Sequence, residues 1–233
     1  MTLPQSTDEQ PIPRAQQAGG RLLVVVAVAA EAEAVLRGAP PGRVTVVTAG
    51  VGPAAAAAAT AFALADGEHP LVVSAGIAGG FAPHAPIGSV VVADAILAAD
   101  LGAETPDGFQ DVAALGFGTV RHTPPPHTVT LLAAATGAVV GPVLTVSTVT
   151  GSAARAAQLT RRHPCVAAEA MEGFGVAEAA ARRGVPALEL RAVSNTVGPR
   201  DRAAWRIGEA LTALQHAFAV LPYDLLLPEA RHG

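Results

Sequence analysis

The sequence contains no lysine, so all 15 of its basic residues are arginine. A Schiff-base enzyme and a Walker A phosphate loop both depend on a lysine side chain, and both are therefore excluded. The basic residues are outnumbered by 19 acidic ones, which gives a formal net charge of −4. Because a nucleic-acid-binding protein needs a basic surface to neutralise phosphates, we expect no nucleic-acid partner.

Cysteine, aromatic side chains and charge are also scarce. The single cysteine, Cys165, excludes a disulfide framework within the chain and a multi-cysteine zinc or iron–sulfur site. The seven histidines are scattered without the spacing of ligands, so we expect no metal site. Hydrophobic residues make up 51% of the 233 residues and charged residues only 15%, which favours one folded domain with a large core.

Residues 1–20 are polar and interrupted by proline. They lack the basic and then apolar segments of a secretory signal, and we expect a disordered tail ahead of a single domain over residues 21–233. Residues 44–64 carry no charge and have the length of a membrane span. Two glycines and a proline at positions 50–53 interrupt them, which favours a strand, a turn and a helix instead. The sequence therefore predicts a cytoplasmic protein without a membrane partner.

Short apolar runs rich in β-branched residues alternate with helical patterns along the chain. The runs that predict strands cover residues 21–29, 43–48, 71–74, 88–93, 142–148 and 186–193. The patterns that predict helices cover residues 31–37, 53–66, 127–136, 166–183 and 201–220. We expect surface loops over residues 94–127, and whether they form a lid stays open. The alternation predicts an α/β fold, a single three-layer domain with a central mixed, mostly parallel sheet flanked by helices.

Ligands of open α/β sheets bind beyond the carboxyl ends of the strands. The residues expected at those ends are Glu31 and Glu33, the turn at Gly50 and Gly52, the glycine-rich loop 76–80, and Ser194 with Asn195. A dinucleotide site is not expected there, because the first strand-to-helix turn has no glycine. Glu172 lies in an apolar stretch, where an unpaired carboxylate is costly and two ligand hydroxyls would be suitable partners.

Four segments at these positions resemble the purine nucleoside phosphorylase and nucleosidase superfamily. They are residues 30–33, 49–53, 75–80, and 170–173 followed by 191–195, and they occur in the family's order. Residues 99–104, 171–175 and 194–201 look most like the futalosine hydrolase branch. The resemblance implies a nucleoside phosphorylase-like fold, an enzyme without a cofactor, a small nucleoside substrate such as futalosine, and a homo-oligomer.

The resemblance also implies roles for individual residues. A glutamate in the first turn activates water in related nucleosidases, and this role maps to Glu31 or, in a second alignment, to Glu33. Met171 and Glu172 match the pair that contacts the ribose, and the Glu172 carboxylate would favour the oxocarbenium-like cation that forms during cleavage. The substrate-binding candidates are Gly50, Gly76, Ile77, Ala78, Met171, Phe174 and Ser194. Two further aromatic residues, Phe109 and Trp205, suit either the ligand or ordinary packing.

Asn195 departs from the adenine-cleaving relatives, which have aspartate at this position. A protonated aspartate can give its proton to N7 of the base, whereas an amide cannot act as an acid. The amide can offer its N–H to N7 or O6 and its carbonyl to N1–H, which suits a 6-oxopurine. The resemblance therefore implies hydrolysis of futalosine to hypoxanthine and dehypoxanthine futalosine, a step of menaquinone biosynthesis.

Phosphorylases of the superfamily commonly hold phosphate with an arginine just before the glycine-rich segment. Residues 71–74 contain no arginine, so water is the expected nucleophile. A phosphate-dependent purine nucleoside phosphorylase acting on inosine or guanosine stays open as the alternative, because Arg121 or Arg155 could reach the site. A nucleoside-binding protein without turnover is a third interpretation. Glu169 is left out of the site, because relatives carry their second glutamate at the position of Ala170.

Overall fold

The structure is a computed structural model that describes residues 20–227, so the expected tail lies outside the described residues apart from Gly20. The strands of the main sheet are β1 (Leu22–Val26), β2 (Val44–Thr48), β3 (Val72–Gly80), β4 (Val90–Ala98), β7 (Arg121–His122), β8 (Val139–Thr145), β9 (Ala168–Ala170) and β10 (Ala187–Thr196). The helices are α1 (Ala29–Gly38), α2 (Pro53–Asp66), α3 (Pro126–Thr136), α4 (Ala153–Arg162), α5 (Gly173–Arg182), α6 (Ile207–Val220) and α7 (Tyr223–Leu226), with a 3₁₀ turn over Arg202–Ala204.

The eight-stranded sheet runs in the order β10-β4-β8-β9-β3-β1-β2, with β7 paired to β4. Its β1–β2, β1–β3, β3–β10, β4–β8 and β8–β9 pairs are parallel, and β3–β9, β4–β7 and β4–β10 are antiparallel. Because β3 also pairs with β10, the strands β3, β10, β4, β8 and β9 close into a ring. The prediction of a mixed, mostly parallel sheet is confirmed.

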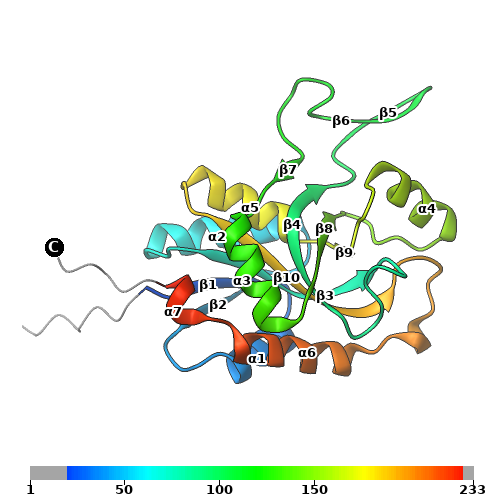
Figure 1. The fold of residues 1–233 in the computed structure, drawn as a ribbon. Helices are drawn as coiled ribbons and strands as arrows, with labels where there is room; N and C mark the ends of the chain where they lie inside the picture. The colour runs from blue at the N-terminus through cyan, green and yellow to red at the C-terminus, as the bar shows by residue number, and fades with distance from the viewer. Residues whose placement is uncertain (1–19, 228–233) are drawn as a thin grey trace, which may run out of the picture.

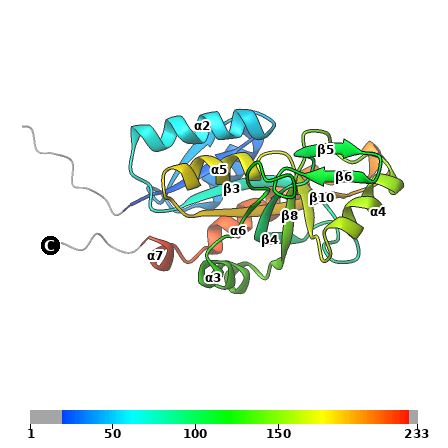
Figure 2. The same cartoon turned by 90° about the horizontal axis from the view of Figure 1, so that it is seen from above.

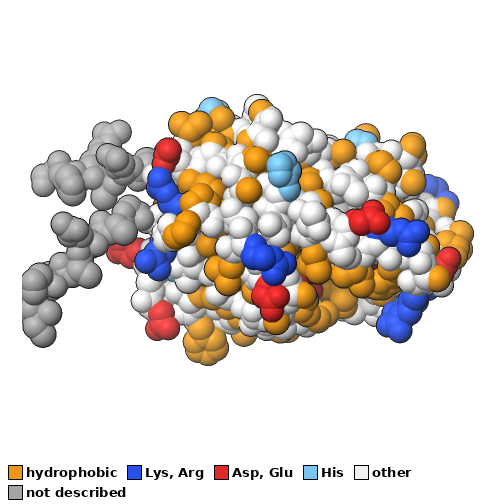
Figure 3. All heavy atoms as spheres, turned by 90° about the horizontal axis from the view of Figure 1, so that it is seen from below, with side chains coloured by type: hydrophobic (Ala, Val, Ile, Leu, Met, Phe, Trp, Pro, Cys, Tyr) orange, Lys and Arg blue, Asp and Glu red, His pale blue; other side chains and the backbone are white. Residues whose placement is uncertain are grey.

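Helices cover both faces of this sheet, which confirms the three-layer prediction. Helices α2 and α5 pack together on one side, whereas α1 and α6 pack on the other with α3 beside α6 (Figures 1 and 2). The larger apolar core lies under α1 and α6, and a smaller one under α2 and α5. On the face drawn in Figure 3, acidic and basic side chains lie side by side among apolar ones. Among residues 20–227, no helix combines the length and the apolarity needed to cross a bilayer.

Two expectations around the site are wrong. Residues 166–183 do not form one helix, since residues 168–170 form β9 and the helix α5 begins only at Gly173. The alanine-rich segment pairs on both sides with β3 and β8, and this pairing overrides its helical preference. Residues 76–80 are not a loop but the second half of β3. Their glycines permit close packing, because a Cβ on Gly80 would lie 2.1 Å from the Ala85 carbonyl oxygen.

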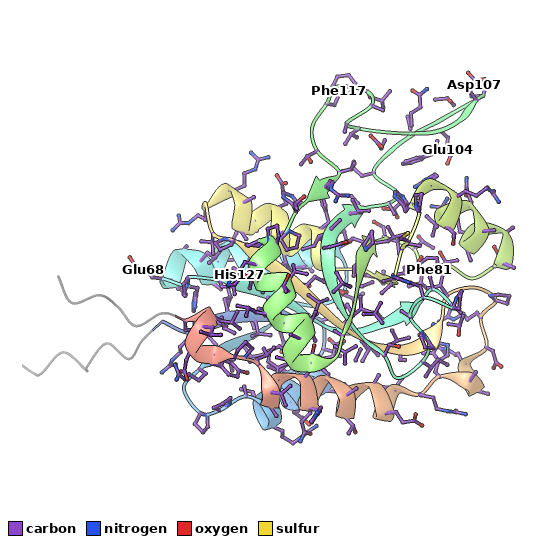
Figure 4. All side chains as sticks on the ribbon, viewed as in Figure 1. Glu68, Phe81, Glu104, Asp107, Phe117 and His127 are labelled. Carbon is purple, nitrogen blue, oxygen red and sulfur yellow. The ribbon has the colours of Figure 1, made fainter. Side chains whose placement is uncertain are left out.

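Other predicted boundaries also shift. Strand β4 continues to Ala98, and the expected loop region contains the hairpin of β5 (Gly102–Thr105) and β6 (Gly108–Asp111). This hairpin forms an arm that projects from the sheet with Asp107 at its tip, and Phe117 lies on the separate loop between β6 and β7 (Figure 4). Strand β8 ends at Thr145 rather than residue 148. Helix α6 begins at Ile207 rather than residue 201. Just before it, Arg206 donates its backbone N–H to the Ser194 carbonyl at 2.8 Å.

Candidate active site

Glu31 is buried at the carboxyl end of β1, in the first turn of α1. Its Oε2 accepts the backbone N–H groups of Ala27 at 2.9 Å and Val28 at 3.2 Å. Its Oε1 accepts the N–H of Ile77 on β3 at 2.9 Å. These three bonds join two neighbouring strands and fix the orientation of the carboxylate.

Arg191 on β10 is the charged centre of the site, with only 1% of its surface exposed. Its Nη2 lies 3.2 Å from Glu172 Oε2 and donates to Ser74 Oγ at 3.0 Å. Its Nε donates to Glu189 Oε1 at 2.9 Å. Glu189 and Arg191 are two residues apart on one strand, so their side chains share a face of the sheet.

The cluster of Glu31, Glu172, Glu189 and Arg191 therefore sets three carboxyl groups against one guanidinium, and we call it the carboxylate cluster. Burial opposes the charge of Arg191, but its carboxylate neighbours, with Glu189 foremost, outweigh burial and hold the pKa of Arg191 above its ordinary value. Burial raises the pKa of the Glu189 carboxyl against the attraction of Arg191. Glu189 Oε2 is buried without a hydrogen-bond partner. The cluster thus gathers three carboxyl groups and one guanidinium in a place shielded from bulk water.

Two glycines make room for this cluster. A Cβ on Gly76 would lie 2.5 Å from Glu31 Oε1 and 2.8 Å from Arg191 Nη1, so both groups pack where only a glycine leaves room for them. Gly52 adopts a φ of +100°, which L-residues with a side chain rarely adopt, and donates its N–H to Glu172 Oε1 at 3.3 Å. Gly52 caps α2 and Glu172 caps α5, so the positive ends of two helix dipoles face the Glu172 carboxylate.

A cavity of about 230 Å³ opens at the carboxyl end of β10, and no residue of the carboxylate cluster lines it. It lies between the carboxyl end of β10, the residues after it and the loop that precedes α4. The residues that line it are Gly79, Ile87, Val149, Thr150, Glu169, Asn195, Thr196, Val197, Gly198, Pro199, Arg200, Asp201, Ala204 and Trp205. The Arg200 guanidinium lies 5.8 Å from the centre of the Trp205 ring, and both residues line the cavity.

The amide of Asn195 is oriented by its neighbour. The Ser194 hydroxyl lies 2.9 Å from Asn195 Oδ1, which leaves the N–H side of the amide for other partners. Nδ2 donates to the Thr196 carbonyl at 3.2 Å and stands over Gly79, where a Cβ would lie 3.3 Å from it. Ser194 itself is 2% exposed and its hydroxyl also reaches the Ala78 carbonyl at 3.3 Å. Ser194 thus acts on Asn195 rather than on the cavity.

The register of β3 against β10 relates the cluster to the cavity. Arg191 pairs with Gly76, and Asn195 pairs with Gly79. Three residues along a strand correspond to about 10 Å. The carboxylate cluster and the Asn195 amide therefore lie at a separation that a nucleoside can span.

Several other predicted residues border the carboxylate cluster. Ile77 donates its N–H to Glu31, and Met171 donates its N–H to Glu172 Oε2 at 3.3 Å. Gly50 donates to the Ala27 carbonyl at 3.1 Å, in the turn that carries Gly52 toward Glu172. Phe174 donates its N–H to Thr145 Oγ1 at 2.8 Å and packs its ring against His122, 5.0 Å away between centroids.

Two predicted residues lie apart from both the cluster and the cavity. Glu33 has a side chain that is 69% exposed and pairs with Arg37 at 3.4 Å. Phe109 lies on the projecting hairpin, with the Arg162 guanidinium 4.2 Å from its ring centre. The geometry favours Glu31 over Glu33 and leaves Phe109 with a packing role in this chain.

Sequence reasoning missed Arg191, Ser74 and Glu189 as members of the cluster, and left out Glu169, which lines the cavity. The signal was present in the strand patterns. Glu189 and Arg191 are the only charged residues in a run of apolar ones, and Glu169 shares another such run with Glu172. A charged residue in a buried strand needs a partner, so these three positions were candidates for a functional network.

The family model and the curated relatives that match this chain point to the same superfamily. The family model described as the phosphorylase superfamily matches residues 27–221. The chain is 62% identical over 221 residues to a futalosine hydrolase from Streptomyces coelicolor, covering 86% of this chain and 94% of that protein. It is 50% identical over 218 residues to a futalosine hydrolase from Acidothermus cellulolyticus, covering 85% and 89%.

Among solved structures, the fold is similar to S-adenosylhomocysteine nucleosidase from Streptococcus pyogenes, crystallised with 5-methylthiotubericidin. The TM-score is 0.74 at 20% sequence identity, covering 89% of this chain and 100% of that one. At this identity the likeness shows the fold, and it confirms the predicted nucleoside phosphorylase-like architecture.

Proposed function

Since this chain belongs to the futalosine hydrolase family within the phosphorylase superfamily, we propose that it uses water to cleave the N-glycosidic bond of futalosine, releasing hypoxanthine and dehypoxanthine futalosine. In this proposal the reaction is a step of menaquinone biosynthesis, as the resemblance implies. The homo-oligomer that the resemblance implies stays a prediction.

Glu31 is the proposed general base. Its carboxylate accepts three backbone N–H groups, which fix its orientation. Oε1 accepts only the Ile77 N–H among these, so in this proposal its second lone pair accepts a hydrogen bond from the attacking water. Proton removal by Glu31 would then direct the water's lone pair to the anomeric carbon.

Glu172 is the proposed partner of the ribose hydroxyls. Its two oxygens accept N–H groups at 3.3 Å from Gly52 and Met171, and each oxygen keeps capacity for a further donor. As the glycosidic bond breaks, positive charge develops on the sugar. A cluster with three carboxyl groups and one guanidinium favours that charge in a site shielded from water.

Asn195 is the proposed partner of the leaving base. Its Oδ1 accepts the Ser194 hydroxyl and one Nδ2–H donates to the Thr196 carbonyl, so the second N–H is available to N7 or O6 of the purine. A hydrogen bond there stabilises the negative charge that the departing base acquires.

The charge of the cluster supports water over phosphate as the nucleophile. Arg191 is already engaged by Glu172, Glu189 and Ser74, so it has no free bidentate face for phosphate. Arg121 is exposed on β7, and Arg155 donates to Gln158 on its own helix at 2.7 Å. An incoming phosphate dianion would meet mainly carboxylates. The phosphorylase alternative is therefore not favoured.

The observation that carries the proposal is the buried carboxylate cluster. It lies at Gly76 on β3, three residues from Gly79, which pairs with Asn195 on β10. The test is to incubate the purified protein with futalosine, inosine and methylthioadenosine, each with and without phosphate, and to follow the free base by chromatography. We expect hypoxanthine from futalosine at a rate independent of phosphate. Release that requires phosphate would establish the phosphorylase, and preferential release of adenine would refute the assignment of Asn195.

A further inference from the structure

Glu189 has no task in the proposed reaction, although it is the most deeply buried carboxyl of the carboxylate cluster. It is 0% exposed. A Cβ on Gly173, the first residue of α5, would collide with both of its carboxyl oxygens, so the carboxyl packs directly against the backbone there. Glu189 therefore does not reach a substrate, and any part that it plays in the reaction passes through its neighbours.

A carboxyl at this position is costly. The neighbours of Glu189 on its own strand, Leu188 and Leu190, belong to the apolar core. Glu189 Oε1 accepts a hydrogen bond from Arg191 Nε at 2.9 Å, whereas Oε2 has no hydrogen-bond partner within residues 20–227. Incomplete pairing of a buried charge costs free energy that an apolar side chain of similar size avoids. The retained carboxyl points to a use of its charge other than stability.

Arg191 is shared between Glu189 and Glu172. Its Nε bonds to Glu189, and its Nη2 lies 3.2 Å from Glu172 Oε2. Burial lowers the pKa of Arg191, but the carboxylates raise it further, Glu189 most and Glu172 next. One guanidinium carries one positive charge, and charges act strongly on one another in a buried site. An ionised Glu189 therefore neutralises Arg191 and leaves the charge of Glu172 uncompensated.

We infer that Glu189 is a positioning residue that neutralises Arg191, so that the Glu172 carboxylate keeps its negative charge for the cation that forms on the ribose. This inference rests on the proposed function and deepens it. The hydrogen bond to Nε also orients the guanidinium, which leaves Nη2 to Glu172 and Ser74. The effect belongs to the transition state, because the sugar is neutral until the glycosidic bond breaks.

The test compares two substitutions of Glu189. Glu189→Gln keeps the reach of the side chain and an oxygen for Arg191 Nε but removes the charge, whereas Glu189→Asp keeps the charge and shortens the side chain. We expect kcat on futalosine to fall about tenfold in Glu189→Gln with KM within about twofold, and to stay within about threefold of wild type in Glu189→Asp. A role in packing or hydrogen bonding alone predicts the reverse order, because glutamine fills the same space.

Glu68→Gln is the matched control for the loss of a carboxylate. Glu68 is exposed and follows the carboxyl end of α2, whereas Gly52, which contacts Glu172, lies at the other end (Figure 4). This helix of 14 residues is about 20 Å long. The control should keep the wild-type kcat.

The pH profile gives a readout that packing would not move. Burial raises the pKa of Glu189, Arg191 on the same strand lowers it, and Glu172 raises it. Glu189 loses its charge as the pH falls through the raised value, and the protonated wild type then resembles Glu189→Gln. The ratio of the wild-type kcat to the variant kcat should therefore decline toward one on the acid side, while the titration of Glu31 is common to both proteins. A ratio that is independent of pH would contradict the inference.

The outcomes separate the inference from the proposed function. A wild-type kcat in Glu189→Gln, or a larger loss in Glu189→Asp than in Glu189→Gln, would overturn the role of Glu189 alone. If Glu189→Gln does not fold, Glu189→Asp decides: a kcat within about threefold of wild type supports the inference, and a loss of about tenfold contradicts it.

Absence of futalosine cleavage by wild type would overturn the proposed function. Calorimetry would still test Glu189 with two uncleavable C-nucleosides of hypoxanthine, one with a protonated nitrogen in the sugar ring and one with the neutral ring oxygen. Glu189→Gln should weaken binding of the cationic analogue about tenfold and leave that of the neutral one unchanged. Equal changes for the two analogues would contradict the inference.

Discussion

Arg191 Nη2 lies 3.2 Å from Glu172 Oε2 in the interior of the protein, where the two side chains are 1% and 7% exposed. The pair joins the strand that carries Asn195 to the residue that caps α5. A buried ion pair is costly to break from one side, because the remaining charge stays unsolvated. This relationship makes the site and the stability of the fold depend on the same residues.

Replacement of Arg191 by methionine should therefore destabilise the protein. The variant leaves Glu172 and Glu189 without their shared cation, and we expect a loss of about 3–5 kcal/mol in the free energy of unfolding. Urea denaturation followed by circular dichroism measures it. Arg37→Met, which removes an exposed pair with Glu33, should change stability by less than about 1 kcal/mol. Equal effects of the two variants would contradict the account of the cluster.

Glu172→Gln should reduce turnover while the fold persists, because Glu189 still pairs with Arg191 in the variant. The amide keeps the shape of the side chain but removes the charge that favours the oxocarbenium-like cation. We expect kcat on futalosine to fall by about 10²–10³-fold, the loss typical of removing one transition-state contact of this kind. Steady-state kinetics with a thermal melt of each preparation checks this. A variant that keeps wild-type kcat would show that the Glu172 charge has no part in the reaction.

Gly76→Ala should disturb both Glu31 and Arg191. The added Cβ would lie 2.5 Å from Glu31 Oε1 and 2.8 Å from Arg191 Nη1, so these groups must shift. We expect a stability loss of about 1–3 kcal/mol together with a loss of activity. Gly208→Ala is the matched control, because no heavy atom lies within 4 Å of its added Cβ and the residue is in helix α6. This control should be neutral or slightly stabilising.

Stability should also depend on pH through Glu169. Its pKa is raised in the folded state, mainly by burial, so the folded protein holds this proton more tightly than the unfolded chain. The resulting contribution is fully present below the ordinary pKa of 4.5 and is lost as pH rises through the raised value. Glu169→Gln should flatten the fall in unfolding free energy that begins above the ordinary pKa of 4.5, with an upper limit of about 1.4 kcal/mol per pH unit. Identical slopes for wild type and variant in urea titrations would contradict this.

Much of the fold follows from local patterns. The strand predicted at residues 43–48 and the helix after Pro53 are placed correctly, and the strand predicted at residues 21–29 exists but ends at Val26, three residues early. The strand β9 was missed because its three residues acquire their conformation from β3 and β8 rather than from local preference. The glycine-rich half of β3 was missed for a related reason: its glycines serve close packing, not a turn.

Site residues could be predicted from the sequence only where they lie in a recognisable motif. Glu31, Glu172 and Asn195 were named from the resemblance, and the register of β3 against β10 places Asn195 about 10 Å from the carboxylate cluster. Arg191 and Glu169 were not assigned to the site because their places in it depend on which strands are adjacent. Glu169 lies beside Gly79 only through the short antiparallel β3–β9 pair, which no local pattern indicates.

The most direct test of the central claim compares Glu31→Gln with Glu33→Gln. The two glutamates are two residues apart on one helix, yet one is bound to three backbone N–H groups in the site and the other is exposed beside Arg37. The rate of hypoxanthine release from futalosine should fall by about 10²–10⁴-fold in Glu31→Gln, the usual contribution of a general base. It should stay within about twofold of wild type in Glu33→Gln, because an exposed charge far from the reacting atoms adds little. Full activity of Glu31→Gln, or a loss confined to Glu33→Gln, would contradict the assignment of the carboxylate cluster as the hydrolytic site.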